Sequence, residues 1–155
     1  DCGADFIVAL PQWGEEYQLR HSAKQSQWAE KMVGWGASAI VGSHPHVVQD
    51  SSHIGRTAIV YSMGNAVSNM SATNTRLELM VTLRFVHDQS TGEKTMLEPE
   101  VQFMWCTLPG MLFDTYSTIL VKDWTTRRSE WSNVGDFDNM MQTYRRVKAA
   151  TGIED

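Results

Sequence analysis

Two histidines separated by a single proline are the residues of this sequence with the clearest capacity for chemistry. They are His44 and His46, in the run Gly42-Ser43-His44-Pro45-His46. In extended backbone, residues two apart project to the same side, and Pro45 biases His44 toward that conformation. Two parallel imidazoles can ligate one divalent ion or one each of two ions, and imidazole is a common ligand for Zn, Mn and Fe. The spacing is compatible with a metal-binding loop, but such a pair by itself is more often a pair of hydrogen-bonded loop histidines.

The elements around this loop are predicted to form a strand–helix–strand unit. Residues 5–11 and residues 38–42 are short apolar runs that predict buried strands. Between them, Ser22 followed by Gln25 is a capping-box pattern that predicts the start of a helix. This order is typical of parallel α/β sheets, in which ligands collect beyond the carboxyl ends of the strands. We therefore expect the segment around Gln12 and the histidine loop to meet at one edge of the sheet.

The second half of the chain predicts antiparallel strands and a closing helix. Residues 56–62 are expected to be a third strand, and residues 76–86 alternate apolar and polar side chains. A partner strand around 100–107 would make an antiparallel hairpin, and 116–122 a further strand. Residues 136–150 place apolar side chains at helical spacing. The expected fold is α/β, with a mixed sheet, an antiparallel hairpin and a C-terminal helix.

Several polar residues are expected to face solvent. In the strand at 76–86, the apolar side chains would point to the core, and Arg76 and Glu78 would lie on the opposite, exposed face. The remaining histidines have no partner pattern and are expected at the surface; they are His21, His53 and His87.

Composition narrows the classes of protein that fit. The chain has 155 residues, 42% hydrophobic and 20% charged, which is ordinary for one folded domain. Its net charge is −5 and its 13 lysines and arginines are scattered, which argues against a duplex nucleic-acid partner. No apolar run approaches the ~20 residues of a membrane-spanning helix. Cys2 and Cys106 either form one disulfide in an exported protein or are two unrelated thiols.

Three blocks of sequence, in order, resemble the CapA-like family of poly-γ-glutamate capsule biosynthesis proteins. Residues 39–49, AIVGSHPHVVQ, are similar to the family's G-x-H-P-H-V motif. Residues 13–17, WGEEY, are similar to H-W-G-x-E-Y, and residues 61–65, YSMGN, to Y-S-L-G-N-F. These blocks lie within residues 5–67, whereas residues 75–155 carry no matching motif.

The resemblance implies a fold and a metal site. The CapA family looks like a branch of the calcineurin-like metallophosphatases, which are α/β sandwiches with a two-metal site. Residues 1–155 would then be one partial domain, the C-terminal half of the sandwich, with the N-terminal half preceding Asp1. The superfamily's last ligands are a lone histidine and G-H-x-H. His44 and His46 correspond to the G-H-x-H pair and Gln12 to the lone histidine, so the implied cofactor is a divalent metal such as Mn, Zn or Fe.

The resemblance also suggests roles for the neighbouring residues. His46 and Glu16 are the candidate catalytic residues, with Glu16 either orienting a histidine or acting as acid or base. A solvated loop carboxylate is the alternative for the glutamates of this block. Asn65 either caps a turn or faces a bound anion. The expected binding residues are Gln12, Trp13, Gly14 and Asn65.

Three interpretations of function remain open from the sequence. The first is a phosphatase-like metal-dependent hydrolase that takes an anionic polymer or a phosphate-type substrate. It would act in the synthesis, export or anchoring of a poly-γ-glutamate-type polymer, in the cell envelope or outside the cytoplasm. The second is a catalytically degenerate binding or scaffold module that has lost its metals. The third is a half-domain that is inactive by itself and whose exposed sheet edges favour self-association.

Overall fold

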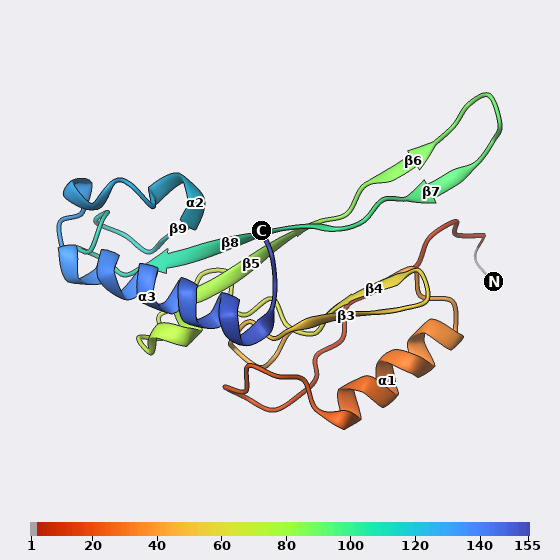
Figure 1. Cartoon of the computed structure of the whole chain (residues 1–155), viewed down its shortest axis with the longest axis horizontal. Coiled ribbons are helices and arrows are strands. Elements are labelled where there is room, and N and C mark those ends of the chain that lie inside the picture. Colours follow the sequence, from red (N-terminus) through yellow and green to blue (C-terminus); the bar gives the residue numbers. More distant parts are fainter. Residues whose placement is uncertain (1–2) are drawn as a thin grey trace.

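The structure, a computed structural model, describes residues 3–155, and its first sheet contains both parallel and antiparallel strands (Figure 1). The strands are β1 (Val8–Ala9), β2 (Ala39–Val41), β3 (Ser51–Ile54) and β4 (Thr57–Val60), in the order β1-β2-β4-β3. Strands β1, β2 and β4 run parallel, and β3 is antiparallel to β4. The prediction of a mixed sheet is confirmed.

Helix α1 (Ala23–Gly34) connects β1 to β2 and lies along this sheet (Figure 1). It begins at the predicted capping box, in which Ser22 Oγ accepts the Gln25 N–H and Gln25 Oε1 accepts the Ser22 N–H. On its inner side the fully buried Ala29 packs against β2 and β4. The strand–helix–strand unit is therefore as the sequence predicts.

A second, antiparallel sheet carries most of the core. It consists of β5 (Leu77–Thr82), β8 (Glu100–Thr107) and β9 (Ser117–Leu120), in the order β5-β8-β9. Helix α3 (Val134–Thr151) lies along this sheet (Figure 1). Two valines from the region of the first sheet, Val48 and Val60, belong to the same core. This core includes Val48, Val60, Leu77, Leu79, Phe103, Trp105, Phe137, Met140 and Val147. The predicted hairpin and C-terminal helix are both confirmed.

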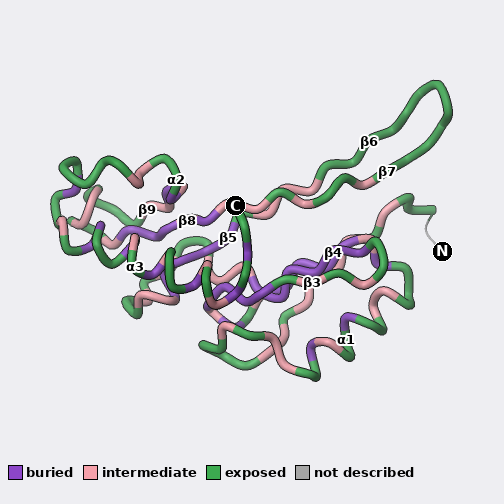
Figure 2. The backbone as a smooth tube through the Cα atoms, viewed as in Figure 1, coloured by how far each residue is buried: buried purple, intermediate pink, exposed green. Residues whose placement is uncertain are grey.

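A two-stranded ribbon projects from the second sheet. It is made of β6 (Phe85–His87) and β7 (Lys94–Met96), which continue β5 and lead into β8 (Figure 1). Figure 2 shows that this ribbon is almost wholly exposed. At its base, the ring of Phe6 lies 4.9 Å from that of Phe85, so the N-terminal segment packs against the ribbon.

Three short helical turns complete the described chain. They are η1 (Thr73–Arg76), α2 (Val121–Trp124) and η2 (Arg128–Glu130). None of the helices in residues 3–155 has both the length and the apolar character that crossing a membrane requires. Cys106 is buried, whereas Cys2 lies outside the described residues, so the structure does not test a disulfide between them.

The structure corrects two details of the strand assignment. Residues 5–11 do not form a buried strand, since pairing is limited to β1 and the flanking Ile7 and Leu10 are 47% and 71% exposed. The reason is topological, because β1 is the edge strand of its sheet and has one strand neighbour. The hairpin partner β3 was not predicted, because its sequence, Ser-Ser-His-Ile, lacks a clear apolar alternation.

Arg76 and Glu78 are buried, and their predicted exposure is wrong. The Arg76 guanidinium makes two hydrogen bonds to the Asp136 carboxylate, at 2.6 and 2.7 Å, and lies 4.3 Å from the centre of the Trp105 ring. Burial of a charge is tolerated when it is paired and hydrogen-bonded, as here. Alternation along a strand assigns side chains to two faces, but it does not show that both faces are covered.

Glu78 is fully buried without a partner. Neither of its carboxyl oxygens has a partner with good hydrogen-bond geometry among the described residues. The nearby Thr118 hydroxyl favours the charged form to a small extent, but it donates its own hydrogen bond to Ala66 O at 2.6 Å. Burial disfavours the charged form and raises the pKa of Glu78 to about 8. The side chain is therefore protonated at neutral pH in the folded chain.

This burial predicts a pH-dependent stability. Between its ordinary pKa of 4.5 and about 8, Glu78 keeps a proton in the folded state that the unfolded state releases, so stability falls as pH rises. We expect the stability of wild type relative to Glu78→Gln to decline between pH 5 and pH 8, by on the order of 1–4 kcal/mol. Urea unfolding across this range measures it, with the exposed Glu100→Gln as control. A flat difference between wild type and Glu78→Gln would contradict the assignment.

Candidate functional site

The segment after β1 and the histidine loop after β2 meet at one end of the sheet, as predicted. Their backbones continue the parallel pairing beyond the strands, with Gln12 bridged to Ser43. The Ser43 N–H donates to Pro11 O at 3.0 Å, and the Trp13 N–H donates to Ser43 O at 3.1 Å. This end is the carboxyl edge of the parallel strands, where α/β sheets place their ligand sites.

A hydrogen bond from the Trp13 side chain fixes the segment after β1 and the histidine loop to the end of β4. Trp13 Nε1 donates a 2.8 Å hydrogen bond to Tyr61 O, and the two rings stack with centroids 5.7 Å apart. The bond passes directly over Gly42, where a Cβ atom would collide with both Tyr61 O and Trp13 Nε1. Only glycine fits at position 42, because Trp13 and the Tyr61 carbonyl occupy the space that a side chain would need.

The histidine loop is not extended, which corrects the prediction for its backbone. His44 has a backbone φ of 100° and His46 a φ of 60°, and residues other than glycine rarely adopt positive φ. Tyr17 has φ of 65°, and its N–H donates to Pro45 O at 2.8 Å. This contact between the loops overrides the local preference for extended backbone. Strained non-glycine residues of this kind cost about 1–3 kcal/mol each and cluster at functional sites.

The hydrogen bonds of Asn65 determine which nitrogen of His46 carries the proton. The Asn65 amide nitrogen donates to two carbonyls, Thr75 O at 2.9 Å and His46 O at 3.4 Å. Its Oδ1 consequently faces His46 Nδ1, at 2.9 Å, and can only accept a hydrogen bond. In the neutral ring Nδ1 therefore carries the hydrogen, and Nε2 presents its lone pair.

The free nitrogen of His46 points into an open part of the loop. Its Nε2 lies 3.9 Å from Glu16 Oε1, and the two side chains are 36% and 48% exposed. The Tyr17 ring stacks on His46 at 6.1 Å between centroids, and the ring of His44 lies 6.2 Å away. The structure therefore brings four of the residues singled out in the sequence to one place, and Glu16 is the glutamate of its pair that reaches the histidine.

The other candidate residues, Gln12, Trp13 and Gly14, lie next to His44. Gln12 Nε2 donates to Ser43 Oγ at 2.8 Å, which ties this amide to the loop. Gln12, Trp13, Gly14 and His44 line a common cavity. Within residues 3–155, no group of three or more His, Cys, Asp or Glu side chains is arranged to hold an ion. His44 and His46 are the two imidazole side chains that the described chain brings to this loop.

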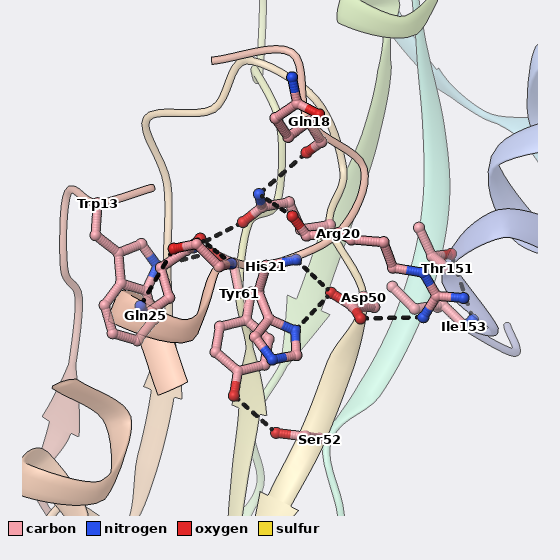
Figure 3. Close-up of polar contacts among 12 residues, drawn as sticks. Trp13, Gln18, Arg20, His21, Gln25, Asp50, Ser52, Tyr61, Thr151 and Ile153 are labelled. Atoms are coloured by element: carbon pink, nitrogen blue, oxygen red, sulfur yellow. Dashed lines mark hydrogen bonds and ion pairs between the residues drawn. The ribbon is translucent and has the colours of Figure 1, made fainter. Parts of the chain in front are cut away.

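A polar network around Asp50 holds residues 18–21, the segment that follows Glu16 and Tyr17, and Figure 3 shows its hydrogen bonds. Asp50, which is 6% exposed, accepts hydrogen bonds from the His21 backbone at 3.0 Å, His21 Nδ1 at 2.9 Å and Arg20 at 3.1 Å. Burial of Asp50 opposes its charge, but the bonds from His21 and Arg20 outweigh it and lower the pKa. The His21 ring also stacks on Tyr61, with centroids 3.7 Å apart.

Two buried glutamines continue this network. Gln49 is fully buried, and its amide nitrogen donates to Gln18 O at 3.0 Å and to Arg20 O at 3.2 Å. Its Oε1 accepts from Gln25 Nε2 at 2.8 Å. The side chain of Gln49 therefore links the segment before α1 to the capping box of that helix.

Sequence reasoning missed this network and placed His21 at the surface, which is wrong. His53 and His87 are exposed, as predicted. Nothing in the spacing of His21 distinguishes it from them, because its partner Asp50 is 29 residues away along the chain. The signal that could have pointed to the network is Gln49-Asp50, a polar pair that directly follows the apolar Val47-Val48 and continues the histidine motif.

The role assigned to Asn65 can be tested by the protonation pattern of His46. We expect long-range ¹H–¹⁵N NMR to show the Nδ1–H form for His46 in the wild type. Asn65→Leu removes the acceptor and should abolish this preference, whereas Asn65→Asp retains an acceptor and should preserve it. The signals of His53 serve as an internal control. Detection of a wild-type His46 that is mainly Nε2–H would refute the assignment.

The anchoring role of Asp50 predicts a loss of stability with a defined pH range. Asp50→Asn keeps the shape but weakens the charge-assisted bonds, and we expect a cost of roughly 1–3 kcal/mol at neutral pH. Because the pKa is lowered in the folded state, this advantage is present above the ordinary value of 3.8 and disappears as pH falls through the lowered pKa. Urea unfolding at pH 6 and near pH 3 measures it. The exposed Asp123→Asn is the control, and an equal loss in both variants would contradict the proposed anchoring.

Comparisons with known proteins cover the same part of the chain. Residues 1–70 match the family model described as bacterial capsule synthesis protein PGA_cap. The capsule biosynthesis protein CapA of Bacillus anthracis is 41% identical over 78 residues, which is 50% of this chain and 19% of that protein. The PGA biosynthesis protein CapA of Bacillus subtilis (strain 168) is 40% identical over 78 residues, 50% of this chain and 20% of that protein.

These matches confirm the resemblance and set its extent. The chain spans about a fifth of the length of these relatives. No solved structure matches the chain. The matched region contains β1, α1, the histidine loop and the segment with Asn65. Over residues 1–70, this chain is therefore similar to the bacterial capsule synthesis protein family PGA_cap.

Proposed function

We propose that this chain is part of a CapA-type protein that acts in the synthesis, export or anchoring of a poly-γ-glutamate-type capsule polymer. We further propose that its histidine loop is the C-terminal part of a divalent metal site in a phosphatase-like hydrolase. The observation that carries this proposal is the state of His46. Asn65 holds the proton on Nδ1, so that Nε2 presents a lone pair toward the open side of the loop.

This arrangement is the one that a metal-binding histidine needs. Ligating histidines donate their other ring N–H to an oxygen acceptor, which fixes the ring and its protonation. The donor set also fits Mn, Zn or Fe, because imidazole nitrogen suits these ions. His44 and His46 would be the ligands from this chain, and the remaining ligands would come from outside residues 1–155. When bound, a divalent ion supplies Lewis acidity and lowers the pKa of water.

The protein groups around the loop have separate tasks in this proposal. Glu16 Oε1 lies 3.9 Å from His46 Nε2, so in this proposal it would accept a hydrogen bond or a proton from a water molecule bound beside the loop. The Tyr17 ring stacked on His46 limits rotation of the imidazole. The strained backbone at His44 and His46 keeps both rings at the crossing of the two loops. The substrate would be an anionic polymer or a phosphate-type group.

The proposed setting is the cell envelope, outside the cytoplasm. It rests on the names of the relatives, which are capsule and PGA biosynthesis proteins. The net charge of −5 does not favour a polyanion by itself, so positive charge has to come from bound metal and from local basic residues.

A second candidate function is a degenerate envelope module that binds the polymer or a partner without metal. One observation favours it, namely that Gln12 replaces the family's lone histidine and donates to Ser43 at 2.8 Å. A neutral amide is a poorer ligand than imidazole for Zn or Fe. The two candidates differ in whether the purified protein retains metal.

Metal content distinguishes them. The whole protein, including the part proposed to supply the ligands outside residues 1–155, is purified from medium supplemented with Mn and Zn. It is analysed by elemental mass spectrometry beside its double variant His44→Ala/His46→Ala. We expect about one or two ions per chain in the wild type and none in the double variant. The control is His53→Ala/His87→Ala, which removes two exposed histidines away from the loop and should retain the metal.

The Gln12→His variant sharpens this experiment. Restoring the family's histidine should raise metal occupancy if Gln12 weakens the site. Metal-free wild type together with metal-free Gln12→His would rule out the hydrolase and leave the degenerate module. Equal loss of metal in the control double variant would show that the histidine loop is not the metal site.

A further inference from the structure

A cavity of about 680 Å³ lies beside His44. Its walls come from three elements that the fold brings together: the segment after β1, the first turns of α1, and the loop after β2. The lining residues that matter for binding are Trp13, Glu15, Lys24, Trp28 and His44. The cavity therefore opens directly next to the proposed metal-binding loop.

The floor of this cavity is rigid. Gly14 packs directly on the amide of the buried Gln25, where a Cβ atom would come within 2.8 Å of three amide atoms. Both ends of that amide are engaged, with Ser22 and Gln49 as partners. Trp13 is held in place by its hydrogen bond to Tyr61 O. A cavity with fixed walls loses little conformational entropy when a ligand binds.

The charged side chains at this cavity form no ion pairs with other described residues. Among residues 3–155, neither Lys24 nor Glu15 takes part in an ion pair. The indole of Trp28 is 40% exposed, and the nearby Lys31 amine lies 4.6 Å from the centre of its ring. One free cation, one free carboxylate and two indole surfaces thus share the same space.

We propose that this cavity binds one repeating unit of an amide-linked chain whose units carry free carboxylates. In this arrangement Lys24 pairs with the carboxylate of the unit, and Glu15 accepts a hydrogen bond from its amide N–H. The methylene groups of the unit pack on the Trp13 and Trp28 indoles. With one unit bound here, the next amide bond of the chain would lie close to His44 in the proposed metal-binding loop. This assignment rests on the proposed function, because it identifies the subsite for the polymer at that same site.

The same charges disfavour a phosphate group in this cavity. A phosphate monoester carries about two negative charges and has little hydrogen to donate near neutral pH. The Glu15 carboxylate would repel it, whereas an amide N–H satisfies the same oxygen. A phosphate group has no apolar surface to pack on the two indoles, whereas the methylene groups of a carboxylate-bearing unit do. The cavity therefore favours the polymer over an inorganic anion.

Binding of a short oligomer tests the proposal. The probe is a γ-linked glutamate trimer, titrated into the protein in EDTA and followed by calorimetry, with the γ-linked glutamine trimer as the uncharged comparison. We expect the glutamate trimer to bind and Lys24→Gln to weaken its binding roughly twofold to fivefold, in line with one partly exposed ion pair. Trp28→Ala should weaken both trimers, since it removes packing surface.

Lys94→Gln is the matched control, because it changes the net charge by the same amount on the distant ribbon, and it should bind as wild type does. Equal affinity of wild type and Lys24→Gln, tighter binding of inorganic phosphate, or no binding of the trimer at millimolar concentration would each overturn the proposal. His46→Ala separates this result from the hydrolase proposal. It should lose metal yet bind the trimer in EDTA, so a failed metal experiment leaves the cavity test intact.

Discussion

The hydrogen bond from Trp13 Nε1 to Tyr61 O is the contact on which the candidate site depends. Trp13 follows β1, Gly42 follows β2 and Tyr61 follows β4, so this bond ties the carboxyl ends of all three parallel strands at one point. It requires a residue without a side chain at the crossing. The histidine loop starts immediately after that crossing, and its position is therefore set by the sheet.

The loop itself is held in a strained state by contacts from both sides. Tyr17 binds the carbonyl between the two histidines, and Asn65 binds His46 through both its ring and its carbonyl. The Asp50 and Gln49 network holds residues 18–21, the segment that follows Glu16 and Tyr17. A rigid frame around a strained, half-exposed imidazole is the arrangement that preorganised binding sites use.

Much of the frame could be predicted from the sequence. The capping box at Ser22 and the apolar runs around it were sufficient for the strand–helix–strand unit, and hence for the meeting of Gln12 with the histidine loop. Alternation over 76–86 located the hairpin correctly. It misplaced Arg76 and Glu78, because a second layer covers the face that the pattern assigned to solvent.

Local patterns, then, determined which elements form and which residues reach the end of the sheet, because helix caps, apolar periodicity and short motifs act over a few residues. Only the tertiary structure decided the backbone of His44 and His46, the protonation of the His46 ring and the role of His21. Each of these depends on a partner between 19 and 29 residues away along the chain, such as Asn65 for His46, Pro45 for Tyr17 and Asp50 for His21. Contacts at that separation are made by the fold as a whole, and no spacing in the sequence displays them.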